Sequence, residues 1–413
     1  MMKLLSGSGL PLMSLSAVCR VAEARRGIAT YALTAAAALI MSLPVVCVAQ
    51  TIGTEPPGEF WEHASVGVRA LQNWYSNETG LYQTTGWWNS ANAITVLDNY
   101  MELSHSKEYL PILDHTFSTA QLTNKDFLNN FYDDEGWWAL AWLSTYDLTK
   151  NPKYLAMAEV IFKDMKGGWS DDVCGGGIWW SKDRQYKNAI ANELFLSVAA
   201  HLTNRVANPK HKAQYLSWAS REWIWFGASG MVNAKELIND GLISKQPSAC
   251  VNNGLTTWSY NQGVILGGLT ELATAENDPA PLFAAHGIAD AALHELTDTR
   301  GILHDECEPN CGKDGVQFKG IFLRNLTELE VVLPRPEYKI FAENNAASIW
   351  VNSQDDQHQF GEVWSGPFDA GNAGSQSSAL DAIIAAAEMD KPRAPIAFQK
   401  RPKVRHSSNG DHQ

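Results

Sequence analysis

The chain has 413 residues, of which 45% are hydrophobic, enough for one large globular core or for two smaller ones. Its formal net charge is −13 at pH 7, although both ends of the chain are basic. An acidic body of this kind repels phosphate backbones, so no nucleic-acid partner is expected. The 16 tryptophans exceed the usual content, and because indole rings stack on sugars they favour a carbohydrate ligand.

Residues 1–49 are predicted to be a targeting segment. Two arginines precede an apolar run over 28–48, and Cys47 and Ala49 form a small-residue cleavage pattern. The run is long for a signal peptide, so the segment is either a signal peptide or an uncleaved N-terminal anchor. No second apolar span of that length follows, and the polar C-terminus offers no lipid-anchor signal. We therefore expect a secreted or cell-surface protein without a stable membrane partner.

From Glu59 onward the apolar residues recur with a period close to 3.6, and clusters of Gly, Pro and Asn interrupt the pattern. This pattern predicts helices, and no convincing run of alternating strand residues is present. Twelve helices are predicted, over residues 59–75, 88–104, 107–122, 134–148, 152–166, 186–203, 208–226, 257–275, 279–296, 318–331, 335–352 and 375–389.

The predicted helices alternate in character. Every second one opens with a polar and aromatic cluster and continues in Ala, Gly and Leu, as a helix buried on all sides should. Six inner and six outer helices in alternation predict an all-α fold, an (α/α)6 barrel over residues 50–390, followed by a disordered basic tail at 391–413. The inner helices of such a barrel start at the same end, so their openings should form one ring around one cleft.

The fourth predicted helix opens with two adjacent aspartates, Asp133 and Asp134, followed by Trp138 and Trp142 at a step of four. Cleavage of a glycosidic bond requires a carboxylic acid beside a carboxylate, and a retaining glycosidase holds the two about 5–5.5 Å apart. Neighbouring side chains at a helix start can splay to that spacing. The pair is therefore the candidate catalytic centre. The alternative is a capping aspartate followed by a solvated one.

Two other adjacent acid pairs, Asp171-Asp172 and Asp355-Asp356, lie in loops rich in Ser, Gln or Gly, where solvated turn residues are the ordinary interpretation. The histidines are scattered, and neither a His-Glu-x-x-His motif nor a phosphate-binding glycine loop is present. We therefore expect no metal and no other cofactor.

The openings of the other inner helices offer amide, ammonium, indole and phenol groups that suit sugar hydroxyls and sugar faces. For each asparagine among them, an N-cap is the alternative interpretation. These candidate substrate-binding residues are Trp87, Trp88, Asn188, Asn192, Tyr260, Asn261, Gln262 and Lys319.

Four cysteines lie beyond the targeting segment, at positions 174, 250, 307 and 311. An even count in an exported chain favours two disulfides, a local Cys307–Cys311 pair and the remaining Cys174–Cys250 pair. Free thiols and a zinc site are the alternatives, although no second close Cys/His pair accompanies the local one.

In four segments the chain resembles glycoside hydrolase family 76, the endo-α-1,6-mannanases and their fungal cell-wall relatives. The resemblance covers about residues 60–390 and implies an (α/α)6 barrel with an open cleft. It also implies retaining cleavage of α-mannan or manno-oligosaccharides without a metal. The segments are Tyr132 to Trp138, Lys187 to Glu193, Tyr260 to Gly263 and Phe318 to Phe322.

By the same resemblance, Asp133 is the nucleophile and Asp134 the acid/base of an exported enzyme, which we expect to be a monomer. Cell-wall cross-linking members of the family often carry a C-terminal lipid-anchor signal, and its absence here favours a hydrolase. The alternative function is a cell-wall mannoside transglycosylase that uses the same pair. A non-catalytic glycan-binding protein would need a broken pair, and a uronate lyase would need a cleft lined by Arg and Lys.

Overall fold

The computed structural model of the chain describes residues 58–246, 249–391 and 398. The chain divides into one unit of residues 1–50 and a second of residues 51–413, and every described residue belongs to the second. The predicted targeting segment and nearly all of the predicted tail therefore lie outside the described residues. Among the described residues, no helix has the length and apolar character needed to cross a membrane.

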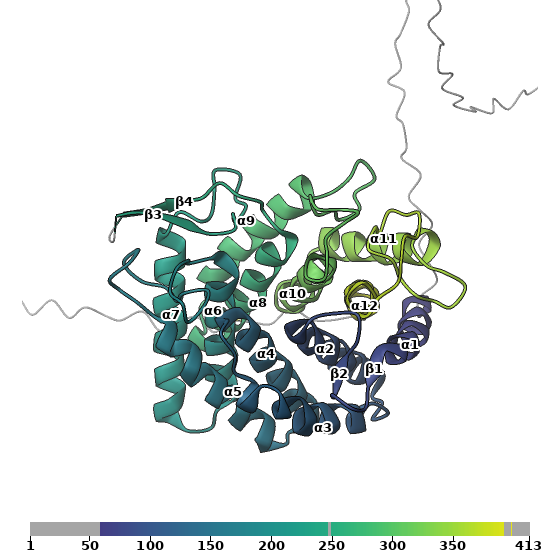
Figure 1. Ribbon diagram of the computed structural model, residues 1–413. Coiled ribbons are helices and arrows are strands. Elements are labelled where there is room, and N and C mark those ends of the chain that lie inside the picture. Colours follow the sequence, from purple (N-terminus) through teal and green to yellow (C-terminus); the bar gives the residue numbers. More distant parts are fainter. Residues whose placement is uncertain (1–57, 247–248, 392–397, 399–413) are drawn as a thin grey trace, which may run out of the picture. The chain divides into compact units, whose positions relative to one another are not determined.

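Six helices form a closed inner ring (Figure 1). Each contacts the next along the chain, and the last contacts the first, which closes the ring. Nearly every residue of the third and sixth of these helices is buried, in agreement with their alanine-rich sequences. The inner helices are α2 (Trp87–Ser104), α4 (Tyr132–Thr149), α6 (Ala189–Arg205), α8 (Ser259–Glu276), α10 (Phe318–Val332) and α12 (Ala373–Met389).

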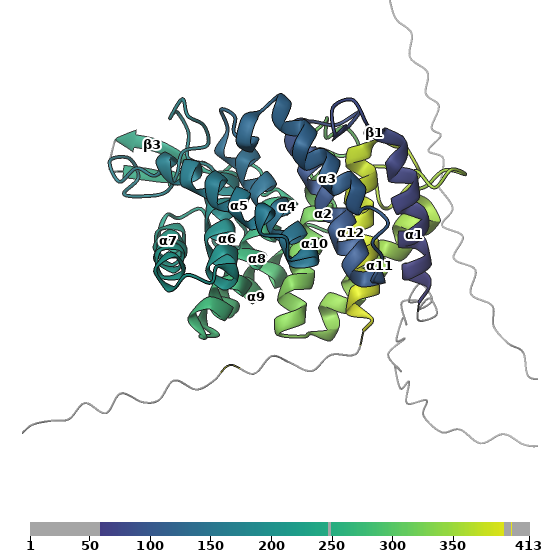
Figure 2. The same cartoon turned by 90° about the horizontal axis from the view of Figure 1, so that it is seen from below.

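The other six helices alternate with these along the chain and lie outside them, and in Figure 2 α1 and α7 flank the inner helices on opposite sides. All but the first carry a proline in their first turn, where the fixed φ angle of proline favours a helix start. The predicted (α/α)6 barrel is confirmed. The outer helices are α1 (Glu59–Leu71), α3 (Leu110–Thr119), α5 (Pro152–Met165), α7 (Pro209–Ala228), α9 (Ala280–Glu295) and α11 (Pro336–Asn352).

The sequence shows no convincing run of alternating strand residues, yet the structure contains short strands. Two antiparallel hairpins occur among the described residues, β1 (Tyr75–Ser76) with β2 (Leu81–Tyr82), and β3 (Leu242–Gln246) with β4 (Ala249–Asn252). Strands of two to five residues are too short to show an alternating pattern in the sequence.

The first and third predicted helices are also too long. Both end in 3-10 turns, and the third starts three residues later than predicted. The 3-10 turns cover Gln72–Trp74, Ala120–Leu122, Lys125–Phe127, Lys166–Gly168 and Gly315–Gln317.

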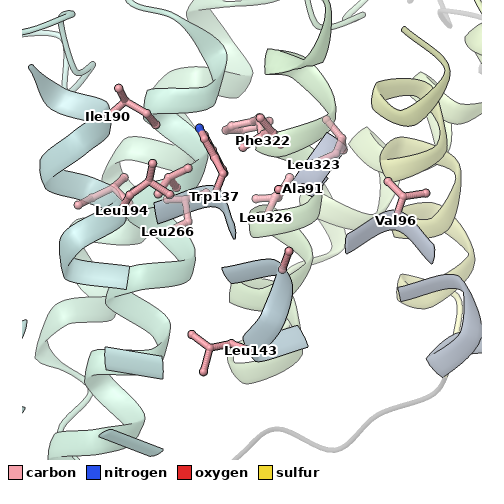
Figure 3. Packing of buried hydrophobic residues seen from close by; sticks show 14 of the residues in the cluster. Ala91, Val96, Trp137, Leu143, Ile190, Leu194, Leu266, Phe322, Leu323 and Leu326 are labelled. Atoms are coloured by element: carbon pink, nitrogen blue, oxygen red, sulfur yellow. The ribbon is translucent and has the colours of Figure 1, made fainter. Parts of the chain in front are cut away.

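Inner helices approach one another closely at glycine positions, because a glycine has no Cβ atom to separate the two backbones. A Cβ atom on Gly263 of α8 would lie 2.6 Å from the backbone of Phe322 in α10. One on Gly320 of α10 would lie 2.5 Å from the backbone of Ser378 in α12. Figure 3 shows the apolar interior that results, with Trp137 of α4 among leucines of the neighbouring helices.

Both predicted disulfides are present. Cys174–Cys250 joins the loop after α5 to β4, across a sequence separation of 76 residues. Cys307–Cys311 closes a local turn ahead of α10. The first of these ties together two of the long loops at the end where the inner helices begin.

Candidate active site

Aromatic side chains from four inner helices meet at the end where these helices begin. Trp88 of α2 stacks on Trp137 of α4, with ring centroids 5.4 Å apart. Trp137 lies 6.4 Å from Tyr260 of α8, which in turn stacks at 3.7 Å on Phe318 of α10. Openings that are up to 230 residues apart in the sequence are thus neighbours, as the predicted ring of openings requires.

Asp133 and Asp134 occupy the first turn of α4 beside these rings, and both are half-buried. The N-cap residue is Phe131, so neither aspartate caps the helix. Carboxylates in a first helical turn are stabilised by the helix dipole. The capping alternative from the sequence is therefore not the arrangement found.

The two carboxyl groups differ in their partners. Asp133 Oδ2 accepts a hydrogen bond of 2.9 Å from the indole Nε1 of Trp180. Its other oxygen, Oδ1, is shielded from solvent and has no hydrogen-bond partner within the described part of the chain. Asp134 Oδ2 accepts a 2.6 Å hydrogen bond from Nδ2 of Asn129. Each aspartate therefore has one oxygen that a neighbouring side chain holds in place.

Both carboxyl groups hold their protons to unusually high pH. Burial raises the pKa of Asp133 to about 8, and the neighbouring charge of Asp134 adds to this effect. Burial also raises the pKa of Asp134 to about 6, against the opposing hydrogen bond from Asn129. Between these two values the pair carries a single proton, as acid and base chemistry at one site requires.

The loop between α5 and α6 brings Trp180 to the pair. The backbone N–H of Tyr132 donates to the carbonyl of Trp180 at 2.9 Å, and this anchors the loop against the start of α4. The side chain of Asn192 on α6 accepts from the N–H of Ile178 and donates to its carbonyl. Nζ of Lys187 donates to four carbonyls of the same loop, those of Ser170, Val173, Gly176 and Gly177.

Four of the predicted substrate-binding residues use their polar groups within the protein. Asn188 is the N-cap of α6, and Asn192 holds the loop just described. Gln262 makes the same two-way contact with the backbone of Ile238. Lys319 is buried in an ion pair with Glu308, 2.7 Å away, and donates to a backbone carbonyl. Contact between these residues and a substrate stays a prediction.

The remaining predicted residues lie among the aromatic rings or just inside them. Trp88 and Tyr260 belong to the stacked row, and Trp87 packs against Trp138 at 5.6 Å. Asn261 is fully buried, and its amide atoms have no hydrogen-bond partner among the described residues. Their substrate contacts are likewise untested predictions.

Three side-chain contacts at the site were not predicted from the sequence. Trp180 and Asn129 hold the two aspartates, and Asp314 accepts a 2.9 Å hydrogen bond from Nε1 of Trp88. The loop tryptophans were visible in the sequence as an excess, but no local signal connects residue 180 to residue 133.

In the two other acid pairs, Asp171-Asp172 and Asp355-Asp356, the first aspartate is bound to other groups of the protein. Asp171 forms an ion pair with Arg221 at 2.7 Å, and Asp355 accepts hydrogen bonds from backbone N–H groups of its own turn. Over residues 58–246 and 249–391, no group of three or more His, Cys, Asp or Glu side chains is arranged to hold a metal ion.

Curated relatives are about a quarter identical to this chain over the residues that align. Mannan endo-1,6-alpha-mannosidase DCW1 of Candida albicans is 25% identical over 275 residues, which are 61% of this chain and 60% of that protein. Mannan endo-1,6-alpha-mannosidase DFG5 of Saccharomyces cerevisiae is 25% identical over 348 residues, 77% and 74% of the two chains. The chain thus spans about three fifths of the Candida protein's length.

Solved structures with the same architecture extend the comparison. One is an inactive variant of the α-1,6-mannanase GH76A of Salegentibacter sp. HEL1_6, in which two adjacent aspartates are replaced by asparagine, in complex with α-1,6-mannotriose. It has a TM-score of 0.72 and 25% identity, covering 80% of this chain and 100% of that chain. The Lin0763 protein of Listeria innocua has a TM-score of 0.71 and 26% identity, covering 79% and 97%.

The family model of glycosyl hydrolase family 76 matches residues 62–397. This match takes in all twelve helices of the barrel except the first few residues of α1, and with them the aspartate pair and the aromatic row. The chain belongs to glycosyl hydrolase family 76.

Proposed function

We propose that this protein is an exported, endo-acting glycosidase that cleaves α-1,6-mannosidic bonds of mannan backbones with retention of configuration. The observation that carries the proposal is the pair of adjacent carboxyl groups with raised pKa values beside a row of aromatic rings. Relatives named mannan endo-1,6-alpha-mannosidases and a neighbour bound to α-1,6-mannotriose support the choice of substrate. Export rests on the sequence of residues 1–49.

In the first step, the ionised carboxylate of Asp133 attacks the anomeric carbon. The glycosidic bond breaks as Asp134 gives its proton to the leaving oxygen. In the second step, Asp134 takes a proton from a water molecule as the water oxygen attacks the anomeric carbon. The bond between this carbon and Asp133 then breaks, which releases the carboxylate of Asp133. Both steps invert the anomeric carbon, so the product keeps the configuration of the substrate.

The proposal places a requirement on the shared proton. In the free protein the pair holds a single proton between about pH 6 and about pH 8, and both carboxyl groups compete for it. A nucleophile must be ionised, and a general acid must be protonated. The proton therefore has to lie on Asp134 in the substrate complex, and the Trp180 indole N–H assists this by stabilising the ionised Asp133.

Incubation of the purified full chain with debranched α-1,6-mannan tests the proposal. We expect internal cleavage to manno-oligosaccharides, and proton NMR of the first products should show the α-anomer at the new reducing end. The β-anomer would contradict retention, and intact mannan would contradict the substrate. Products longer than an added manno-oligosaccharide acceptor would assign the site to mannosyl transfer instead.

A further inference from the structure

The turn between β1 and β2 carries a sequence motif that has no part in the proposed reaction. The chain contains two Asn-x-Ser/Thr motifs, one from Asn77 to Thr79 and one from Asn325 to Thr327. In an exported protein such a motif is an acceptor for N-linked glycosylation, which attaches an oligosaccharide to the asparagine amide nitrogen. Because the oligosaccharide is bulky and hydrophilic, the asparagine has to lie on the surface of the folded protein. The positions of the two motifs in the structure can therefore be compared.

The first motif forms the exposed tip of the hairpin. Asn77, Glu78 and Thr79 lie in the turn that joins the two strands, and all three residues are exposed. The turn is closed by Gly80, whose backbone N–H donates to the carbonyl of Ser76 at 2.8 Å. The side chain of Asn77 takes no part in this turn and has no hydrogen-bond partner among the described residues. Its amide is therefore accessible, and its modification would break no contact.

The other side of the turn is fixed to helix α3, beside which the hairpin lies (Figure 1). Oγ1 of Thr116 donates to the carbonyl of Gly80 at 2.8 Å and lies 3.0 Å from the hydroxyl of Tyr75. A Cβ atom on Gly80 would lie 3.0 Å from the side chain of Thr119. The hairpin thus packs against the barrel through Tyr75 and Gly80, while the residues of the motif face solvent. A glycan on Asn77 would extend into solvent without displacing a helix.

The second motif lies in the interior of the barrel. Asn325 is 5% exposed and stands in the middle of α10, where its Nδ2 donates to the carbonyl of Ile321 at 2.8 Å. Its Oδ1 packs so closely against α8 that a Cβ atom on Gly267 would clash with it. A glycan on Asn325 would break this hydrogen bond and force the two inner helices apart. The folded barrel is therefore incompatible with modification at this position.

We propose that Asn77 is an N-glycosylation site of this protein and that Asn325 stays unmodified. In the reaction, Nδ2 of Asn77 forms a bond to the anomeric carbon of the first sugar of a lipid-linked oligosaccharide diphosphate. The bond between that carbon and the diphosphate oxygen breaks, the lipid diphosphate leaves, and the amide nitrogen loses one proton. The proposal rests on the export proposed above, because this transfer takes place in the secretory pathway. It does not depend on the reaction at the aspartate pair.

The full chain, secreted from a yeast host through its own N-terminus, tests this proposal. Peptides that contain residues 77 and 325 are analysed by mass spectrometry, before and after treatment with a peptide N-glycosidase. This enzyme removes an N-glycan and leaves aspartate in place of the modified asparagine, so it marks the site. We expect a glycan on Asn77 and none on Asn325.

Variants of the first motif provide the controls. Asn77→Gln and Thr79→Ala should each abolish the modification, whereas the matched control Thr79→Ser should keep it, because serine also completes the motif. Activity on mannan should be unchanged in all three variants. The melting temperature of Asn77→Gln should equal that of the enzymatically deglycosylated wild type, since the side chain has no partner among the residues the structure describes.

The possible failures can be told apart. A secreted chain with an unmodified Asn77 would overturn this proposal and leave the proposed function standing. A glycan on Asn325, or equal modification of Thr79→Ala and Thr79→Ser, would overturn it as well. Retention of the chain in the cytosol would overturn the proposed export, and this proposal with it. A glycosylated chain that leaves mannan intact would contradict only the proposed activity.

Discussion

The proposed mechanism depends most on the contact between Asp133 and Trp180. The indole N–H holds one oxygen of the carboxyl group at 2.9 Å, and the other oxygen stays without a partner among the described residues. Trp180 is itself 37% exposed, so packing alone does not explain its position. The hydrogen bond stabilises the ionised form of Asp133, which is the form that the proposed mechanism requires for attack.

Replacing Trp180 by Phe should lower kcat/KM by about tenfold, because one hydrogen bond to the charge of Asp133 is lost. The pKa of Asp133 should rise, so the alkaline limb of the pH profile should move to higher pH. Trp179→Phe is the matched control, since its Nε1 has no partner among the described residues. Equal losses in the two variants, without a shift of the limb, would contradict the role given to Trp180.

The pH dependence of kcat/KM should be bell-shaped, with limbs near the apparent pKa values of the pair, about 6 and about 8. Below the lower value both carboxyl groups are protonated and no nucleophile exists. Above the upper value neither is protonated and no acid exists. Rates measured with α-1,6-mannan across this range check the prediction, and full activity below about pH 5 would contradict it.

Asp133→Asn should abolish turnover and at the same time stabilise the fold at neutral pH. The native carboxyl keeps its proton up to about pH 8, whereas the unfolded chain releases it near pH 4, so the wild-type protein loses stability as pH rises between these values. Asparagine does not titrate, and its amide oxygen still accepts from Trp180. We expect a gain of about 1–3 kcal/mol at pH 7, discounted because Asp133 is only half-buried.

Thermal unfolding of both proteins at pH 7 and at about pH 4 measures this gain. The difference in melting temperature should be present at pH 7 and should be much smaller at the lower pH, where the folded protein keeps the proton and about half of the unfolded chains have regained it. A variant that is less stable than the wild type at pH 7 would contradict the destabilisation that we attribute to the raised pKa of Asp133.

At the scale of single elements, the openings of the inner helices hold the loops that surround the site. Side-chain amides on three of these helices pair with the backbone of the preceding loop: Asn192 with Ile178, Gln262 with Ile238 and Gln376 with Phe360. The recurrence explains why amide residues are frequent at these openings. It also explains how Gly-rich loops stay ordered beside the aspartate pair.

The Cys174–Cys250 disulfide should matter more to the fold than Cys307–Cys311, because it closes 76 residues rather than 4. Replacing both cysteines of the long-range pair by Ser should cost about 2–4 kcal/mol of unfolding free energy. The loop that carries Trp180 would also loosen, so kcat/KM should fall. Chemical denaturation and rates on mannan check both effects, with Cys307→Ser/Cys311→Ser as the matched control. Equal destabilisation of the two variants would contradict this account.

At the scale of the whole molecule, the architecture could be predicted because each helix carries its own signal. Helical periodicity located the twelve helices. The inner helices could be told from the outer ones because the inner ones are richer in small and apolar residues and the outer ones carry more charge. The short hairpins around Tyr75 and Leu242 carry no such signal, because two to five residues cannot display a period.

The site was predictable only in part, for a related physical reason. The aspartate pair is a local feature of one helix start, so the sequence displays it directly. The contact between Trp180 and Asp133 spans 47 residues, and that between Trp88 and Asp314 spans 226, so both arise only once the loops fold. Likewise, the sequence shows that Asn192 and Gln262 stand at helix openings, but not that their amides hold loop backbone.

The most direct test of the catalytic assignment is the configuration of products formed in the presence of azide. An α-1,6-mannobiosyl fluoride substrate needs no acid, so azide can replace whichever carboxylate has been removed. Asp133→Ala should yield the β-azide, because azide attacks from the face that the nucleophile leaves. Asp134→Ala should yield the α-azide, because Asp133 still forms the covalent intermediate. The reversed pattern, or no azide product from either variant, would contradict the account.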